Sequence, residues 1–120
     1  MATGTIPSNY KVATGTITKH SSITSGTLDN TTCYKIGDVV TVSARIHSMN
    51  NATATGPFFV VPDGFRPKYP TRVSGYMNVN GVGSVPLLAT ITSDGRVDIG
   101  YSASSTCTQV GFAGSFAVTT

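Results

Sequence analysis

Apolar and polar residues alternate most regularly in the segment from Val39 to His47. Every second residue is apolar and faces one way, namely Val40, Val42, Ala44 and Ile46. A period of two places successive side chains on opposite faces of a strand, so the segment predicts a strand with one buried and one solvated face. Thr31–Ile36 precedes it, and the Gly37-Asp38 pair between them predicts a hairpin turn.

Further strands are predicted where apolar residues recur between turn-forming residues. They are Lys11–Lys19, Pro57–Val61, Arg72–Asn80, Ser84–Thr92, Arg96–Tyr101 and Thr108–Val118. Residues 49–55 are expected to form a loop, and two prolines exclude a regular strand from residues 62–67. About seven or eight antiparallel strands with short connections indicate an all-β antiparallel β-sandwich or jelly-roll-like barrel.

The length and composition support one β-rich domain. A chain of 120 residues fits a single core, and the abundance of Thr, Ser, Gly and Val without any Glu excludes a helical protein. Residues 1–10 contain turn-forming residues without a period, so they are predicted to be a linker before a domain at 11–120. Charged residues make up 11% of the chain, against about 25% in typical soluble domains, so neutral polar side chains must cover its surface.

The charge and the motifs present argue against several kinds of partner. The net charge of +3 comes from scattered Lys and Arg residues, and without a basic patch we expect no nucleic-acid binding. The longest apolar run is Phe58–Val61, far shorter than the roughly 20 residues of a membrane span, so no membrane insertion is expected. No spacing of His, Cys or carboxylates predicts a metal, and no motif predicts a cofactor. We expect half-buried free thiols at Cys33 and Cys107, with a disulfide between them as the alternative.

The acidic residues favour binding over catalysis. Four of the five stand in contexts typical of turns, namely Asp29, Asp38, Asp63 and Asp94. Asp98 differs because it is predicted to lie in mid-strand, on the face opposite Val97 and Ile99. A glycosidase needs two carboxylates around one bond, and no nucleophile motif is present, so we predict a protein that is not an enzyme.

Three motifs in a fixed order resemble the C-terminal head domain of receptor-binding proteins from tailed phages of Gram-positive bacteria, those of lactococcal siphophages especially. They are Cys33–Val42 (CYKIGDVVTV), Pro62–Pro67 (PDGFRP) and Ile91–Ile99 (ITSDGRVDI), and the resemblance covers about Thr27 to Val118.

The resemblance implies a function at the phage tail tip or baseplate. The expected protein is a homotrimer on the virion that acts at the bacterial surface, where its heads reversibly bind a cell-wall polysaccharide or a glycerol-phosphate-containing glycan. In this family the saccharide site is often a cleft between protomers, so the resemblance implies such a cleft here. The resemblance also implies that the chain is an excised head, with residues 1–10 as a neck remnant and with other baseplate proteins bound through a missing N-terminal part.

Some relatives place a Trp in the saccharide site, and this chain has none, so stacking on a sugar would fall to Tyr or His. Sugar sites combine planar polar groups with aromatic rings. On that chemistry the candidate saccharide-binding residues are Asp98, His47, Arg45, Tyr101, Arg72 and Tyr76. Asp98 is the strongest candidate. If the strand Arg96–Tyr101 meets the outer face of the strand that ends at His47, we expect Asp98 and His47 to hydrogen-bond the sugar, with Arg45 orienting the carboxylate.

Two alternatives to a receptor-binding head stay open from the sequence. The chain could be a structural tail or baseplate subunit without a receptor of its own, or a lectin-like trimeric jelly roll from a source other than a phage. A wall-polymer depolymerase is the least favoured reading.

Overall fold

The structure is a computed structural model that describes residues 12–118, and the linker predicted at residues 1–10 lies outside this range. All regular secondary structure within it is β, and no helix in it is long and apolar enough to cross a membrane. The nine strands are β1 (Val12–Thr14), β2 (Thr18–Lys19), β3 (Thr27–Ile36), β4 (Val39–His47), β5 (Ala54–Val60), β6 (Thr71–Val79), β7 (Gly83–Ile91), β8 (Arg96–Ser102) and β9 (Cys107–Ala117). The described chain thus contains more than the predicted seven or eight strands, because the predicted strand at 11–19 forms two short ones.

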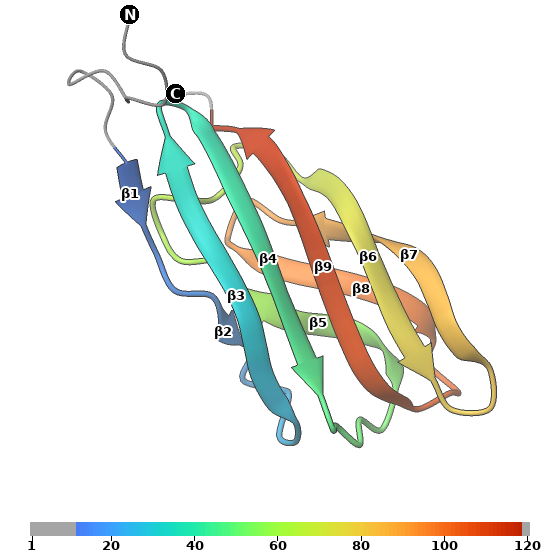
Figure 1. Ribbon diagram of the computed structural model, residues 1–120. Coiled ribbons are helices and arrows are strands. Elements are labelled where there is room, and N and C mark those ends of the chain that lie inside the picture. The colour runs from blue at the N-terminus through green and yellow to red at the C-terminus, as the bar shows by residue number, and fades with distance from the viewer. Residues whose placement is uncertain (1–11, 119–120) are drawn as a thin grey trace, which may run out of the picture.

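The strands form one curled antiparallel sheet in the order β1-β3-β4-β9-β6-β7-β8-β5-β2 (Figure 1). Strands β3, β4, β9 and β6 run side by side in front, and β8 and β5 lie behind them. Only residues 89–91 of β7 pair with β8, whereas the whole of β7 pairs with β6. Strand β7 therefore connects the front of the curled sheet to its back.

The predicted hairpin at Gly37-Asp38 is confirmed, a second hairpin joins β6 to β7, and some strands begin at slightly different residues than predicted. Ile36 pairs with Val39 across Gly37-Asp38, and Val79 pairs with Gly83 across the turn after Asn80. Strand β3 begins at Thr27 instead of the predicted Thr31, because a bulge lets it continue past Asn30, whose φ is +51°. Residues 62–67 lie outside the strands, as predicted, and contain a turn that is closed by the Phe65 N–H donating to the Pro62 carbonyl at 3.2 Å.

Residues 12–19, here called the N-terminal strap, join the two ends of the sheet. Strand β1 pairs with β3 at one end of the strand order, and β2 pairs with β5 at the other end. Ile17 lies between these two short strands and is fully buried. The strap therefore crosses the open side of the curled sheet and covers two strand edges that would otherwise be unpaired.

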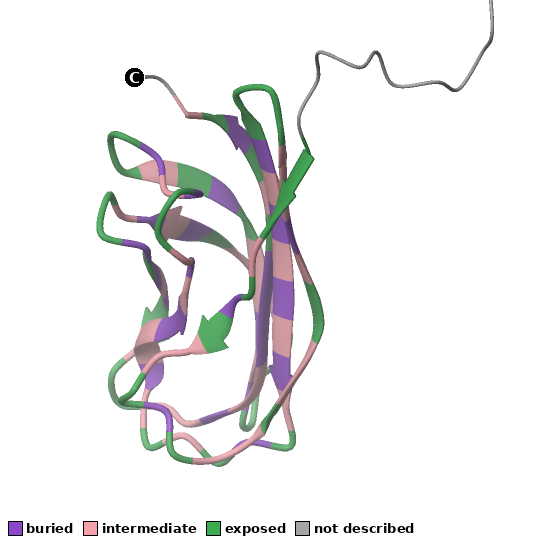
Figure 2. Cartoon of the chain, turned by 90° about the vertical axis from the view of Figure 1, so that its left-hand side faces the viewer, coloured by how far each residue is buried: buried purple, intermediate pink, exposed green. Residues whose placement is uncertain are grey.

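The apolar side chains of the strands point to the inside of the curled sheet and form one core. Figure 2 shows the buried residues along the strands. The alternation in β4 is confirmed, since Val40, Val42 and Ile46 are fully buried. The rings of Phe59 and Phe112 pack at a centroid distance of 4.9 Å. Cys33 and Cys107 are free thiols, as expected. They are buried in the core, whereas the prediction was that they would be half-buried. Burial raises the pKa of both thiols.

Candidate functional site: a groove over β9

Three successive outward-facing residues of β9 are small, namely Gly111, Ala113 and Ser115, and larger side chains stand beside Gly111 on both neighbouring strands. Arg45 of β4 and Tyr76 of β6 both pair with Gly111, and Ser43 and Ser74 pair with Ala113 in the next outward row. Because the side chains of β9 are shorter than those beside them, a groove of about 350 Å³ lies over β9 and is here called the β9 groove. Its walls include Asn30, Ser43, Arg45, Ser74, Tyr76 and Ala113.

Arg45 is held in a fixed orientation by Asp29 on the neighbouring strand β3. Its Nε donates to Oδ1 of Asp29 at 2.8 Å, and its Nη2 donates to Oδ2 at 2.7 Å. His47 Nε2 lies 3.2 Å from the same Oδ2. The hydrogen bond from Arg45 lowers the pKa of Asp29 below its ordinary value, and the same bond raises the pKa of Arg45. Since the third guanidinium nitrogen, Nη1, makes no hydrogen bond within residues 12–118, it is available to a ligand.

Tyr76 crosses β9 above Gly111. A Cβ atom at Gly111 would stand no more than 3.0 Å from three atoms of the Tyr76 side chain, so the ring occupies space that only glycine leaves open. Gln109 Nε2 donates to the Tyr76 hydroxyl oxygen at 2.7 Å, which leaves the hydroxyl hydrogen free to donate elsewhere. The residue is half-buried, so part of the ring remains open to solvent.

The β9 groove therefore presents hydrogen-bond donors beside an aromatic ring, without a net charge. The Asp29 and Arg45 charges cancel, while Nη1 of Arg45 and the Tyr76 hydroxyl offer N–H and O–H donors. An uncharged ligand with many oxygen acceptors and an apolar face matches this chemistry.

Asp98 lies in a different depression, here called the β8 hollow, of about 610 Å³. The walls of this hollow include His20, Pro57, Leu88, Thr90, Arg96 and Asp98. Asp98 faces outward on β8, as predicted, between Thr90 of β7 and Pro57 of β5. Arg96, two residues earlier on the same strand, donates from Nε to Oδ1 at 2.8 Å and to Oδ2 at 3.1 Å.

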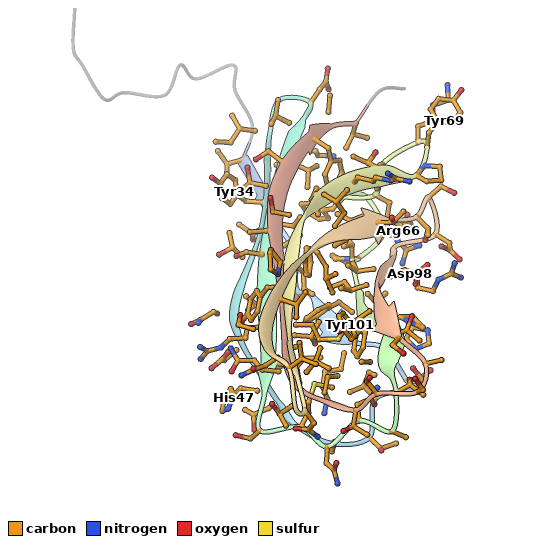
Figure 3. All side chains as sticks on the ribbon, turned by 90° about the vertical axis from the view of Figure 1, so that its right-hand side faces the viewer. Tyr34, His47, Arg66, Tyr69, Asp98 and Tyr101 are labelled. Atoms are coloured by element: carbon orange, nitrogen blue, oxygen red, sulfur yellow. The ribbon has the colours of Figure 1, made fainter. Side chains whose placement is uncertain are left out.

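The structure brings together only some of the candidate residues that the sequence suggested. Arg45 and Tyr76 both line the β9 groove. His47 lies next to the groove, because it contacts Asp29, the partner of Arg45. The expected meeting of Asp98 with His47 and Arg45 is wrong, because three strands separate β4 from β8. Figure 3 shows His47 and Asp98 on opposite sides of the molecule.

Arg72 and Tyr101 line neither depression. Arg72 is exposed on β6, where it pairs with Thr90 of β7, and Tyr101 is exposed near the end of β8. Both therefore stay candidates without a shared pocket.

Sequence reasoning missed Asp29, Gly111 and Gln109. Asp29 was assigned to a turn because Asn30 follows it, but the bulge at Asn30 keeps it in β3 opposite Arg45. The signal that was present is the run of small residues at alternate positions of the last strand, Gly111, Ala113 and Ser115. That pattern predicts a depression in the outer face, although it does not say which side chains border it.

Within residues 12–118, no group of three His, Cys, Asp or Glu side chains is placed to hold a metal ion. No protein-family model matches the sequence, and a comparison with curated proteins gives no significant match. Any functional assignment therefore depends on the geometry of the two depressions and on the motif resemblance.

Proposed function

We propose that the chain is a saccharide-binding head of the phage receptor-binding type, and that it binds a host cell-wall sugar in the β9 groove. The observation that carries the proposal is the arrangement of Tyr76 above Gly111, beside an Arg45 side chain that Asp29 holds in place. A sugar ring has an apolar C–H face and a rim of hydroxyl groups. The Tyr76 ring suits the first, and Arg45 Nη1 suits the second.

The proposed interaction is weak at each site. The groove is shallow and offers no unpaired charge, so one head is expected to bind in the micromolar to millimolar range, about −8 to −4 kcal/mol. Several heads on one virion would raise the effective affinity by about 10² to 10⁴. Weak binding at each site together with many sites on one virion allows attachment to a cell surface that is firm and still reversible.

The resemblance supplies the remaining parts of the proposal. It supports interpreting the curled sheet as a sandwich or jelly-roll head, a homotrimeric assembly, and a place at the tail tip or baseplate of the virion. Light scattering tests the assembly directly, because a trimer gives about three times the mass of one chain and a mass of one chain contradicts it.

We propose binding without catalysis. Asp29 is engaged by Arg45 and Asp98 by Arg96, and the two carboxylates lie on different parts of the sheet. They do not form the pair that a glycosidase places around one bond. Release of reducing sugar from a wall polysaccharide would contradict this part of the proposal.

A binding assay with wall polysaccharides from a panel of Gram-positive strains tests the function. Arg45→Ala and Tyr76→Ala are expected to weaken binding by about tenfold or more, since each removes a ligand contact. The control is Tyr34→Ala, which removes a tyrosine from β3, outside the walls of the β9 groove. If the unmodified chain binds none of the polysaccharides, the structural-subunit alternative is favoured.

A further inference from the structure

The β9 groove lies over the front of the curled sheet and the β8 hollow over its back, and the two adjoin each other at β7. Ala113 and Ser74 both line the β9 groove and pair with each other, and Ser74 also pairs with Leu88 on the next strand. Leu88 in turn lines the β8 hollow. The two depressions therefore meet at β7, with no further strand between them.

The side chains at this meeting point are apolar and exposed. Leu88 has 61% of its surface exposed, and Pro86, which pairs with Tyr76, is also exposed. Because most of the Leu88 side chain stays in water in the folded chain, a ligand that covered it would gain a favourable hydrophobic contribution to binding. Together with the Tyr76 ring, these residues give an apolar surface that leads from one depression to the other.

The two depressions repeat the same chemistry. In each, an arginine is fixed by an aspartate through Nε, Arg45 by Asp29 and Arg96 by Asp98. Within the described chain, neither Nη1 nor Nη2 of Arg96 makes a hydrogen bond, so both can donate to a ligand.

His20 adds one more donor to the β8 hollow. The Ser22 backbone N–H donates to His20 Nδ1 at 3.1 Å, so the neutral ring carries its hydrogen on Nε2. Each depression thus offers a charge-balanced arginine, a further donor and an apolar neighbour.

We propose that the ligand is a chain of several sugar units, bound from the β9 groove across Leu88 into the β8 hollow. This inference rests on the proposed function of the β9 groove. Arg45 on β4 and Arg96 on β8 are four strand spacings apart, about 19 Å along the sheet, so one sugar ring cannot contact both arginines. The repeated arginine and aspartate pair suits a polymer in which similar units recur.

The test uses size-graded fragments from partial acid hydrolysis of whichever wall polysaccharide the unmodified chain binds. Affinity for the fragments, measured by calorimetry, is expected to rise with fragment length. Asp98→Ala and Leu88→Ser are each expected to weaken binding of long fragments by about tenfold and to leave binding of the shortest fragments unchanged. Tyr76→Ala is expected to weaken binding of both.

A matched control for Leu88→Ser is Val82→Ser, which changes another exposed apolar residue in the turn between β6 and β7. Because Leu88, Val82 and Asp98 are not buried, all three variants are expected to keep the melting temperature. If Asp98→Ala and Leu88→Ser bind long fragments as the unmodified chain does, the extended site is wrong while the proposed function stands. If the unmodified chain binds no wall polysaccharide, both proposals are overturned.

Discussion

Tyr76 and Gly111 pair across β6 and β9, and the tyrosine side chain fills the space that the missing glycine side chain leaves. This relationship brings the ring to the centre line of β9, where it stands beside Arg45. A larger residue at position 111 would displace the ring, because its Cβ atom would overlap the Tyr76 side chain. The β9 groove thus depends on a glycine that itself offers no group to a ligand.

Asp29 is expected to act as a positioning residue for Arg45. Asp29→Asn removes the charge but keeps the shape, so the guanidinium loses its bidentate partner and its fixed orientation. We expect sugar affinity to fall by about tenfold. The pair is partly exposed, so the melting temperature should stay almost unchanged. A variant that binds normally would show that Arg45 does not need Asp29.

The carboxyl group of Asp29 is expected to titrate below the ordinary Asp pKa of 3.8. Arg45 favours the ionised carboxylate by hydrogen bonding, and His47 is the other titratable group beside it. Because the pKa of Asp29 is lower in the folded chain, the ion pair stabilises the fold at any pH above the pKa of Asp29 in the unfolded chain. This stabilisation is lost as the pH falls through the pKa of Asp29 in the folded chain. NMR titration of the side-chain carboxyl carbons measures it, and a midpoint at or above 3.8 would contradict the ion pair.

Ile17 is expected to carry much of the stabilising effect of the N-terminal strap. It is fully buried between β1 and β2, so Ile17→Ala should lower the free energy of unfolding by about 2 to 5 kcal/mol. Val12→Ala is the matched control, because Val12 is 51% exposed in the same strap and its truncation should change stability by less than about 0.5 kcal/mol. Equal effects of the two variants in urea unfolding would show that the strap is not packed on the core.

Local sequence patterns predicted most strands but not their order in the sheet. Alternation in Val39–His47 and the turn residues Gly37-Asp38 define a hairpin with only local information. Strands β1 and β2 are separated by residues 15–17, yet they lie at opposite ends of the strand order. Such pairings depend on contacts between distant segments, which a period of two cannot reveal.

The candidate site was predictable only in part for the same reason. Alternation correctly placed Arg45 and Asp98 on the outer face, but it could not say which strands are neighbours. Asp98 was therefore assigned to the wrong arginine, since Arg96 holds it. The role of Asp29 depended on the bulge at Asn30, a backbone feature without a distinct sequence signal.

The two thiols are expected to be unreactive in the folded protein. Cys107 is fully buried and Cys33 almost so, and burial raises the pKa of both, which disfavours the reactive thiolate. Labelling with iodoacetamide should be slow until urea unfolds the chain, and dithiothreitol should not change the melting temperature because both thiols are free. Rapid labelling of the folded chain, or a melting temperature that falls with dithiothreitol, would contradict the placement of the cysteines.

A double-mutant cycle between Gly111 and Tyr76, read as affinity for a wall polysaccharide, tests whether the tyrosine ring over the glycine forms the sugar site. Gly111→Ala leaves every proposed ligand-binding group in the chain and only displaces the Tyr76 ring. We expect Gly111→Ala and Tyr76→Ala each to weaken binding by about tenfold or more, and the double variant to bind no more weakly than Tyr76→Ala alone. Normal binding by Gly111→Ala, or losses that add in the double variant, would contradict a sugar site built by Tyr76 over Gly111.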